Sequence, residues 1–287
     1  MKILFCTDGS KISFNALKNL AAWIKEATID TISVIDWNIL PDEINVEDKG
    51  FSSSCANVAD SILDYAEEES LKLGFNIGER IKTCGSVIES ILEQTKNTKY
   101  DLILMGSHGK KGIQRWLGSV SQEIINSSHI SNYIAKEENE NQKVLFTTDG
   151  TECSLYVIER IIKEINLDNK EIHICMVNED PNFLFLEGTL DSNWLLDILR
   201  QQQMHATNAI ESIKKIIENN GFFVNKTKIL SGIPAQEIIN YSKNNKIDLI
   251  ILGSRNKSKM DRFLLGSVSK RVIENVTSDV WLVRCES

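Results

Sequence analysis

The chain has 287 residues, of which 42% are hydrophobic and 25% charged, and its formal net charge is -8. The length favours about two domains, and the composition is typical of a globular protein with apolar cores. The negative charge argues against general nucleic-acid binding, which needs a basic surface to displace phosphate counterions.

The sequence leads us to expect neither a membrane-spanning segment nor a signal peptide. No apolar run approaches the roughly 18 residues that span a bilayer, so we expect no membrane partner. The apolar start, Met1–Cys6, is shorter than the ~7–15-residue core of a signal peptide, and we therefore expect a cytoplasmic protein. The six cysteines form no C-x-x-C pair, so we expect neither a metal site nor a disulfide. Cys6, Cys84 and Cys175 fall in strand-like runs, where buried thiols are expected.

An internal repeat organises the chain. The segment Asp101–Gly109 recurs as Asp248–Asn256, and each copy is followed by the sequence Gly-Ser-Val-Ser. The spacing between copies is 141 residues at Asp8 and Asp149, 147 at Gly106 and Gly253, and 148 at Gly118 and Gly266. This pattern predicts a tandem duplication with domains at 1–136 and 143–287, joined by a charged linker at 137–142.

Strands and helices alternate in chain order within each half. Unbroken apolar runs at 102–105 and 249–252 are typical of parallel strands covered on both faces. Apolar residues spaced three and four apart predict amphipathic helices between the strands. The alternation predicts an α/β fold, with a doubly wound parallel sheet in each half. In the first half we expect strands at roughly 2–6, 31–36, 75–83, 102–105 and, weakly because it is polar, 130–135, with helices after Ser10, at roughly 56–73 and 86–96, and from Ser119. In the second half we expect strands at roughly 143–148, 171–178, 222–230, 249–252 and 280–283, with helices after Gly150, at roughly 191–220 and 235–243, and from Ser267.

The carboxyl ends of the strands form the expected ligand site, because open α/β sheets bind ligands there. Asp8 or Asp149 ends the first strand of a half, and a Gly-Ser pair begins its fourth helix. A helix N-terminus offers free N–H groups and a positive dipole end, and glycine lets a ligand approach the backbone, so the pattern favours phosphate. Basic side chains also gather in these turns: His108, Lys110, Lys111, Arg115, Arg255, Lys257, Lys259 and Arg262.

Structural roles compete with the functional ones. A Gly-Ser pair before a helix is a common cap, and Asp8 and Asp149 could cap the next helix or accept a ribose hydroxyl. The chain has no G-x-x-x-x-G-K-[ST], G-x-G-x-x-G or G-x-S-x-G motif. Its four histidines lack metal-ligand spacing, and no acid–base pair stands out, so we expect no metal, no catalytic residues and no enzyme activity.

At these residues the chain resembles the universal stress protein family, twice over and along nearly its whole length. Nucleotide-binding members carry G-x2-G-x9-G-[ST] after the fourth strand and an Asp ending the first. The resemblance implies Rossmann-like five-stranded parallel sheets in the order 3-2-1-4-5, with ATP or a related adenine nucleotide at the glycine motif and Mg held only through the phosphates. It also implies that domains pair. A tandem chain would form that pair internally, which leaves room for a homodimer.

The resemblance implies a set of nucleotide contacts in each half. In the first half these are Asp8, Val34, Met105, Gly106, His108, Gly109, Gly118, Ser119 and Val120. In the second half they are Asp149, Met176, Leu252, Gly253, Arg255, Asn256, Gly266, Ser267 and Val268. The apolar members are also ordinary strand-end core residues, so each has a structural interpretation beside the functional one.

Neither copy follows the family pattern throughout. The first has only eight residues between Gly109 and Gly118, while the second keeps nine but has Asn256 in place of the second glycine. Because the Asn256 Cβ would crowd a phosphate, the sequence slightly favours the first half as the nucleotide site. The usual proline before the last strand is absent in both halves, which makes the pairing strand at 130–135 less certain.

The functional hypothesis is a stress-response protein that binds ATP as a sensor or regulator, with at most slow, incidental hydrolysis. A nucleotide-free scaffold that binds protein partners or an apolar ligand is the alternative. An ATP-using enzyme is the third interpretation and has the least support.

Overall fold

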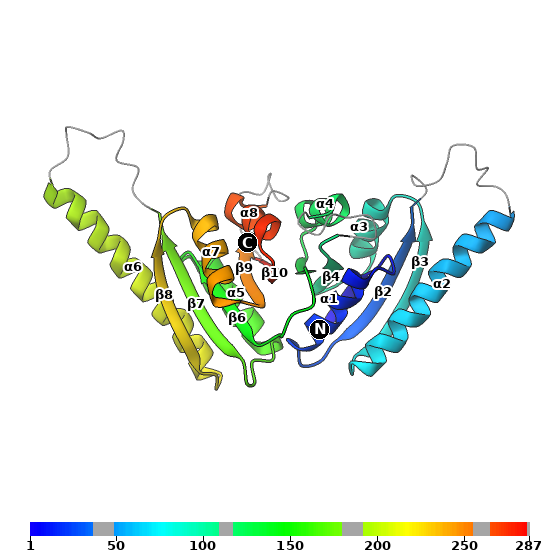
Figure 1. Cartoon of the computed structure of the whole chain (residues 1–287), viewed down its shortest axis with the longest axis horizontal. Coiled ribbons are helices and arrows are strands. Elements are labelled where there is room, and N and C mark those ends of the chain that lie inside the picture. Colours follow the sequence, from blue (N-terminus) through cyan, green and yellow to red (C-terminus); the bar gives the residue numbers. More distant parts are fainter. Residues whose placement is uncertain (37–48, 109–116, 180–191, 255–264, 286–287) are drawn as a thin grey trace.

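The computed structural model describes residues 1–36, 49–108, 117–179, 192–254 and 265–285, of which 49–56, 192, 193 and 195 are described by backbone alone. Eighteen helices and strands alternate in these ranges (Figure 1). The first half comprises β1 (Lys2–Cys6), α1 (Lys11–Ala21), β2 (Thr28–Ile35), α2 (Lys49–Lys72), β3 (Asn76–Cys84), α3 (Val87–Asn97), β4 (Leu102–Gly106), α4 (Ser119–Ser127) and β5 (Ser131–Ala135). The second comprises β6 (Lys143–Thr148), α5 (Glu152–Glu164), β7 (Glu171–Asn178), α6 (Ser192–Asn219), β8 (Val224–Ser231), α7 (Pro234–Asn245), β9 (Leu249–Ser254), α8 (Ser267–Asn275) and β10 (Asp279–Arg284).

The ten strands form one continuous sheet in the order β3-β2-β1-β4-β5-β10-β9-β6-β7-β8. Each half has the expected order 3-2-1-4-5, and all strand pairs inside a half are parallel. The two halves meet where β5 pairs antiparallel with β10. The expected fold class is confirmed, and the internal pairing makes the two sheets a single one.

The helices cover both faces of this sheet, as a doubly wound fold requires. One apolar cluster runs across both halves and contains residues of α1, α2, α5 and α6. Two further clusters lie on the opposite face, one under α3 and α4 and the other mainly under α7 and α8. Figure 1 shows α2 and α6 at the two outer ends of the sheet and the strand junction between the halves. Within the described ranges, none of the helices combines the length and apolarity that a membrane crossing requires.

Local signals account for most element boundaries. The Ser10 hydroxyl accepts a hydrogen bond from the Ser13 N–H and caps α1. Pro234 occupies the first turn of α7, where its missing N–H costs nothing. Helix α2 begins at Lys49, about two turns before the expected start at Ala56.

Strand β5 was expected to be weak because its sequence is polar, yet all five of its residues are buried. It is a central strand with β4 on one side and β10 on the other, so its backbone is paired along both edges. Two of its polar side chains donate hydrogen bonds inside the protein: the Tyr133 hydroxyl to Asp279 over 2.8 Å, and the Asn132 amide nitrogen to the Ile130 carbonyl over 2.7 Å. Tertiary pairing therefore overrides the weak local preference.

The β5–β10 junction repeats the same contacts at both of its ends. Asp279, which begins β10, accepts the Lys136 N–H at 2.8 Å, and Ser131, which begins β5, accepts the Arg284 N–H at 3.2 Å. The Lys136 ammonium then donates to the Ile273 carbonyl of α8 over 2.6 Å. Arg284 donates in turn to the Ile125 carbonyl of α4. Each half thus sends one buried cation to the carboxyl end of the other half's last helix, where the helix dipole favours positive charge.

Lys136 and Arg284 offer a direct test of this exchange. Replacing either with Met should lower the free energy of unfolding by about 1–3 kcal/mol, because a buried helix carbonyl loses its donor. Urea unfolding of the full chain measures the effect, and Lys243→Met is the control because this exposed lysine lies on α7. The exchange would be unimportant if both Met variants were as stable as the control.

Asp279 is the other buried charge at the junction, with no exposed surface. Burial raises the pKa of its carboxyl to about 7, against the lowering effect of hydrogen bonds from Lys136, Tyr133 and Asn19. The Asn19 amide comes from α1 and donates over 2.8 Å, so this one carboxyl joins β10, β5 and α1. Burial likewise lowers the pKa of Lys136 to about 8.

The raised pKa of Asp279 predicts a specific pH dependence. Because the folded protein binds this proton more tightly than the unfolded chain, whose Asp pKa is about 4, the contribution of Asp279 to stability falls as pH rises through the window from about 4 to 7. The stability of the native protein minus that of Asp279→Asn should therefore fall across this window, by at most about 1.4 kcal/mol per pH unit. Denaturant unfolding of both proteins at several pH values measures the difference, and parallel curves would contradict the prediction.

Candidate functional site

A cavity of about 420 Å³ opens at the carboxyl ends of β6, β7 and β9. The amino end of α8 and the start of α7 complete its wall. This is the edge at which open α/β sheets bind ligands. Its lining residues are Thr147, Thr148, Asp149, Cys153, Ser154, Cys175, Met176, Val177, Glu179, Pro234, Ile238, Leu252, Gly253, Gly266, Ser267, Val268 and Ser269.

The turn after β6 forms one wall and is held by its own side chains. The Thr148 and Ser154 hydroxyls lie 2.8 Å apart, and the Gly150 N–H donates to the Thr148 hydroxyl over 3.0 Å. Asp149 accepts the Thr151 N–H at 3.1 Å and the Thr151 hydroxyl at 2.6 Å. Gly150 has a φ of 75°, a conformation that suits glycine. Asp149 is exposed toward solvent, so it shapes the turn and still presents carboxylate surface at the cavity.

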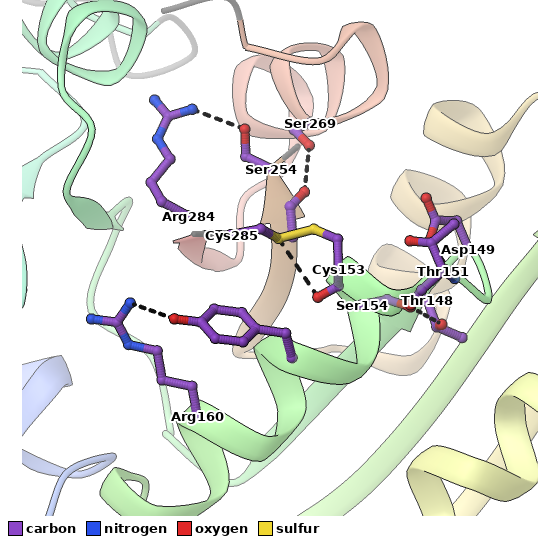
Figure 2. Close-up of a disulfide and its surroundings, with 12 residues drawn as sticks. Thr148, Asp149, Thr151, Cys153, Ser154, Arg160, Ser254, Ser269, Arg284 and Cys285 are labelled. Carbon is purple, nitrogen blue, oxygen red and sulfur yellow. Dashed lines mark hydrogen bonds between the residues drawn. A yellow bond between two sulfur atoms is a disulfide. The ribbon is translucent and has the colours of Figure 1, made fainter. Parts of the chain in front are cut away.

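The amino end of α8 forms the opposite wall. Gly266 occupies the cap position, and no described side chain accepts from the first N–H groups of the helix. The Ser269 hydroxyl donates to the Gly253 carbonyl over 3.1 Å and ties α8 to the end of β9 (Figure 2). A Cβ built on Gly266 would meet no atom of the described residues within 4 Å, so the backbone there borders open space. Such a helix end has the donors and the dipole that attract an anion.

The floor of the cavity is apolar. Met176 and Leu252 are both buried at the ends of their strands. Cys175 is also buried, and desolvation raises the pKa of its thiol to about 12, which makes it a poor nucleophile. Asp149 and Glu179 are the charged residues among those that line the cavity, and both are acidic. The cations expected in this turn, Arg255, Lys257, Lys259 and Arg262, lie outside the described residues.

The structure brings the expected second-half residues together. Seven of them line this one cavity: Asp149, Met176, Leu252, Gly253, Gly266, Ser267 and Val268. Arg255 and Asn256 lie outside the described residues.

The corresponding first-half residues have a tighter arrangement. Val34, Met105 and Val120 pack in the apolar cluster under α3 and α4. The buried His108 ring lies 3.1 Å from the Ser107 hydroxyl. A Cβ built on Gly118 would lie 3.3 Å from the His108 Cα and 3.4 Å from the Ser107 carbonyl oxygen, so backbone lies directly beside this glycine.

Most of the other residues expected at the first-half site lie at the surface or outside the described residues. Asp8 is exposed and accepts the Ser10 N–H at 3.0 Å. Ser119 is exposed and begins α4. Gly106 packs so closely on α1 that a Cβ there would lie 2.7 Å from an Ile12 methyl carbon. Gly109, Lys110, Lys111 and Arg115 lie outside the described residues.

No metal centre is found in the part of the chain that the structure describes. No group of three or more His, Cys, Asp or Glu there could hold a metal ion. His173 is fully buried and lies 2.7 Å from a Glu171 oxygen and 3.1 Å from the Tyr241 hydroxyl. Burial lowers the pKa of this imidazole.

Comparison with known proteins decides the family. The sequence model of the universal stress protein family matches residues 1–136 and again 140–284. The chain belongs to the universal stress protein family. A universal stress protein of Methanocaldococcus jannaschii is 29% identical over 155 residues, which cover 54% of this chain and 89% of that protein. Another, from Synechocystis, is 22% identical over an alignment that covers 98% of this chain and 99% of its own.

A solved structure supports the fold along the whole chain. The crystal structure of a universal stress protein from Archaeoglobus fulgidus covers 99% of this chain and 98% of its own, with a TM-score of 0.67 and 21% identity. At this identity the likeness shows the fold. The tandem arrangement of two universal stress protein domains therefore has full-length counterparts in both sequence and structure.

The expectation that no disulfide forms is wrong. Cys153, in the first turn of α5, is bonded to Cys285, which directly follows β10 (Figure 2). The two residues are 132 apart in sequence, and nothing in their spacing indicates that they meet. The contact between the Thr148 and Ser154 hydroxyls was also not expected from the sequence. The repeat places Thr7 and Ser13 at the matching first-half positions, where the two hydroxyls lie at the same 2.8 Å.

The two strand-end glycines predict an asymmetric response to the same substitution. A Cβ at Gly106 would lie 2.7 Å from an Ile12 methyl carbon and 3.1 Å from backbone atoms of Ile12 and Ser13, whereas at Gly253 the nearest atom, a Val157 methyl carbon, would be 3.3 Å away. Gly106→Ala should therefore lower the free energy of unfolding by about 1–3 kcal/mol through overpacking, and Gly253→Ala by less. Denaturant unfolding ranks the two variants, and equal effects would contradict the contacts.

Proposed function

We propose that this universal stress protein binds an adenine nucleotide, with ATP as the first choice, in the second-half cavity and acts as a sensor or regulator in a stress response. The observation that supports this most is that all seven described residues expected at a second-half nucleotide site line one cavity. They come from the turn after β6, from β7, from β9 and from the start of α8, which are far apart in sequence.

Each wall suits a different part of a nucleotide. The phosphates would accept from the free N–H groups at the start of α8, beside Gly266. The adenine ring would lie against the apolar floor at Met176 and Leu252, and the exposed Asp149 carboxylate would accept a ribose hydroxyl. Magnesium would be held through the phosphates, which would also reduce their repulsion from Asp149 and Glu179.

We assign the nucleotide to the second half, although the sequence slightly favours the first because Asn256 replaces the second motif glycine in the second half. The contrast that decides the assignment lies among described residues: a Cβ on Gly118 would be 3.4 Å from the Ser107 carbonyl oxygen, whereas a Cβ on Gly266 would have no such contact with Ser254, the matching residue. A phosphate beside Gly118 would require Ser107 and His108 to move, and both are buried.

Binding without efficient turnover is the mode of action that we propose. Efficient hydrolysis needs a group that activates the attacking water and one that stabilises the leaving phosphate. The carboxylates of Asp149 and Glu179 are the titratable oxygen groups on the cavity wall, and Asp149 already accepts two hydrogen bonds from Thr151. Hydrolysis would accordingly be slow and incidental.

ATP should raise the melting temperature of the full chain. A ligand at 100 times its Kd stabilises the folded state by about 2.7 kcal/mol, and each kcal/mol raises Tm by roughly 2–4 °C in a chain of this size. Gly266→Val should abolish the shift, because its methyl groups would occupy the space beside the α8 N–H groups. Gly118→Val, the matched variant in the other half, should retain it.

The proposal fails if ATP, ADP and AMP at millimolar concentrations leave Tm unchanged. A shift lost only in Gly118→Val would instead place the nucleotide in the first half. Without any shift, the scaffold function becomes the better account, and α6 would be its candidate surface. That helix exposes large apolar side chains at Trp194, Leu196, Leu199 and Met204.

A further inference from the structure

The Cys153–Cys285 disulfide joins the ligand cavity to the strand junction. Cys153 lines the cavity, directly after the turn shaped by Asp149 and Thr151. Cys285 follows Arg284, whose guanidinium reaches Ser254 at the end of β9 and the Ile125 carbonyl in the other half. Figure 2 shows the two sulfur atoms between these two groups of residues. A covalent bond therefore connects a cavity wall to the strand that holds the halves together.

The fold itself does not need this bond. By the repeat spacing, the first-half positions that correspond to Cys153 and Cys285 are Ile12 and Glu137, which cannot form a disulfide. The first half builds the same turn, sheet order and helices with those residues. The chain also has extensive apolar cores, unlike the small domains that depend on disulfides for stability.

A reductant can reach the disulfide from the cavity. Cys153 is partly exposed and forms part of the cavity wall, whereas Cys285 is 7% exposed. Thiol–disulfide exchange requires access to one sulfur along the S–S axis, and accessible disulfides are the labile or regulatory ones. Access and location distinguish Cys153 from Cys175, a buried thiol in the same cavity.

Loss of the bond would loosen one specific wall. The Cys153 sulfur lies 3.6 Å from the position that a Gly253 Cβ would occupy, so the disulfide packs directly on the end of β9. The backbone N–H of Cys285 donates to the Ser254 carbonyl over 3.3 Å, which is the neighbouring residue on that strand. With the disulfide intact, the start of α5 is held against the ends of β9 and β10.

We propose that the Cys153–Cys285 disulfide is a redox-operated latch on the second-half cavity, which a dithiol opens. The oxidised latch holds the first turn of α5 in the position that favours ligand binding, and reduction releases it. The ligand part of this proposal rests on the proposed nucleotide function, whereas the release of the α5 turn does not.

The opening step is a two-electron exchange. One thiolate of the dithiol attacks the Cys153 sulfur, the S–S bond breaks, and Cys285 leaves as a thiolate that takes up a proton. The second thiol of the reductant then displaces Cys153 from the mixed disulfide. The dithiol ends as its own disulfide, and the two protein thiols carry the two protons that the dithiol loses.

The redox state of the disulfide should change the affinity for ATP, and bound ATP should change how easily the disulfide is reduced. A preorganised wall spares the ligand the cost of ordering it, so the oxidised chain should bind ATP about fivefold or more tightly than the reduced chain. By linkage, saturating ATP should make the disulfide harder to reduce by the same factor.

The experiment compares the full chain in its oxidised and dithiothreitol-reduced forms. Calorimetric titration gives the Kd for ATP, thiol titration after unfolding verifies each redox state, and amide exchange of residues 151–154 reports the α5 turn. Cys153→Ser should bind ATP like the reduced chain whether or not dithiothreitol is present. Cys84→Ser, at an exposed cysteine in the first half, is the matched control and should keep the redox response.

The outcomes separate the latch from the nucleotide function. Equal Kd values and equal amide exchange in the two forms would overturn the latch while leaving nucleotide binding intact. If neither form binds ATP, the proposed function fails, and the latch is then supported by faster exchange of residues 151–154 on reduction and overturned by unchanged exchange. A chain whose thiol count is the same before and after dithiothreitol treatment would also overturn it.

Discussion

The antiparallel pairing of β5 with β10 is the contact on which the rest of the molecule depends. Without this pairing, β5 and β10 would each be an edge strand with unpaired backbone groups. Exposed edge strands can pair with other chains, so proteins usually cover them. Here each edge covers the other, and the exchanged cations Lys136 and Arg284 fix the register at both ends. The buried Asp279 places a carboxyl with a raised pKa at one end of the junction only, so a change of pH affects the two ends differently.

The corresponding strand ends of the two halves are alike in their turns and differ in their surroundings. Both halves inherit the same strand ends, turn and helix start, and the Thr–Ser contact repeats at the same distance. Their surroundings have since diverged. In the first half His108 lies against Gly118, and in the second half a cavity includes Gly266 and a disulfide ties Cys153 in its wall to Cys285 after β10.

Sequence patterns were sufficient for features that depend on local signals. The repeat predicts two α/β halves, and periodicity with the glycine turns places the second-half site residues at one edge of the sheet. Sequence patterns could not predict the packing of residues that are far apart in the chain. The polar sequence of β5 hides a strand that is stable because it is paired on both sides, and Cys153 meets Cys285 across 132 residues. The slight preference for the first half arose from Asn256 in place of a motif glycine, and that substitution carries no information on how closely His108 packs against Gly118.

Binding of an adenine nucleotide in the second half is the central claim, and a crystal structure of the full chain grown with ATP tests it most directly. The account predicts nucleotide density in the cavity between Asp149 and Gly266, with the phosphates at the amino end of α8. Nucleotide bound only beside Gly118, or an empty second-half cavity at saturating ATP, would contradict it.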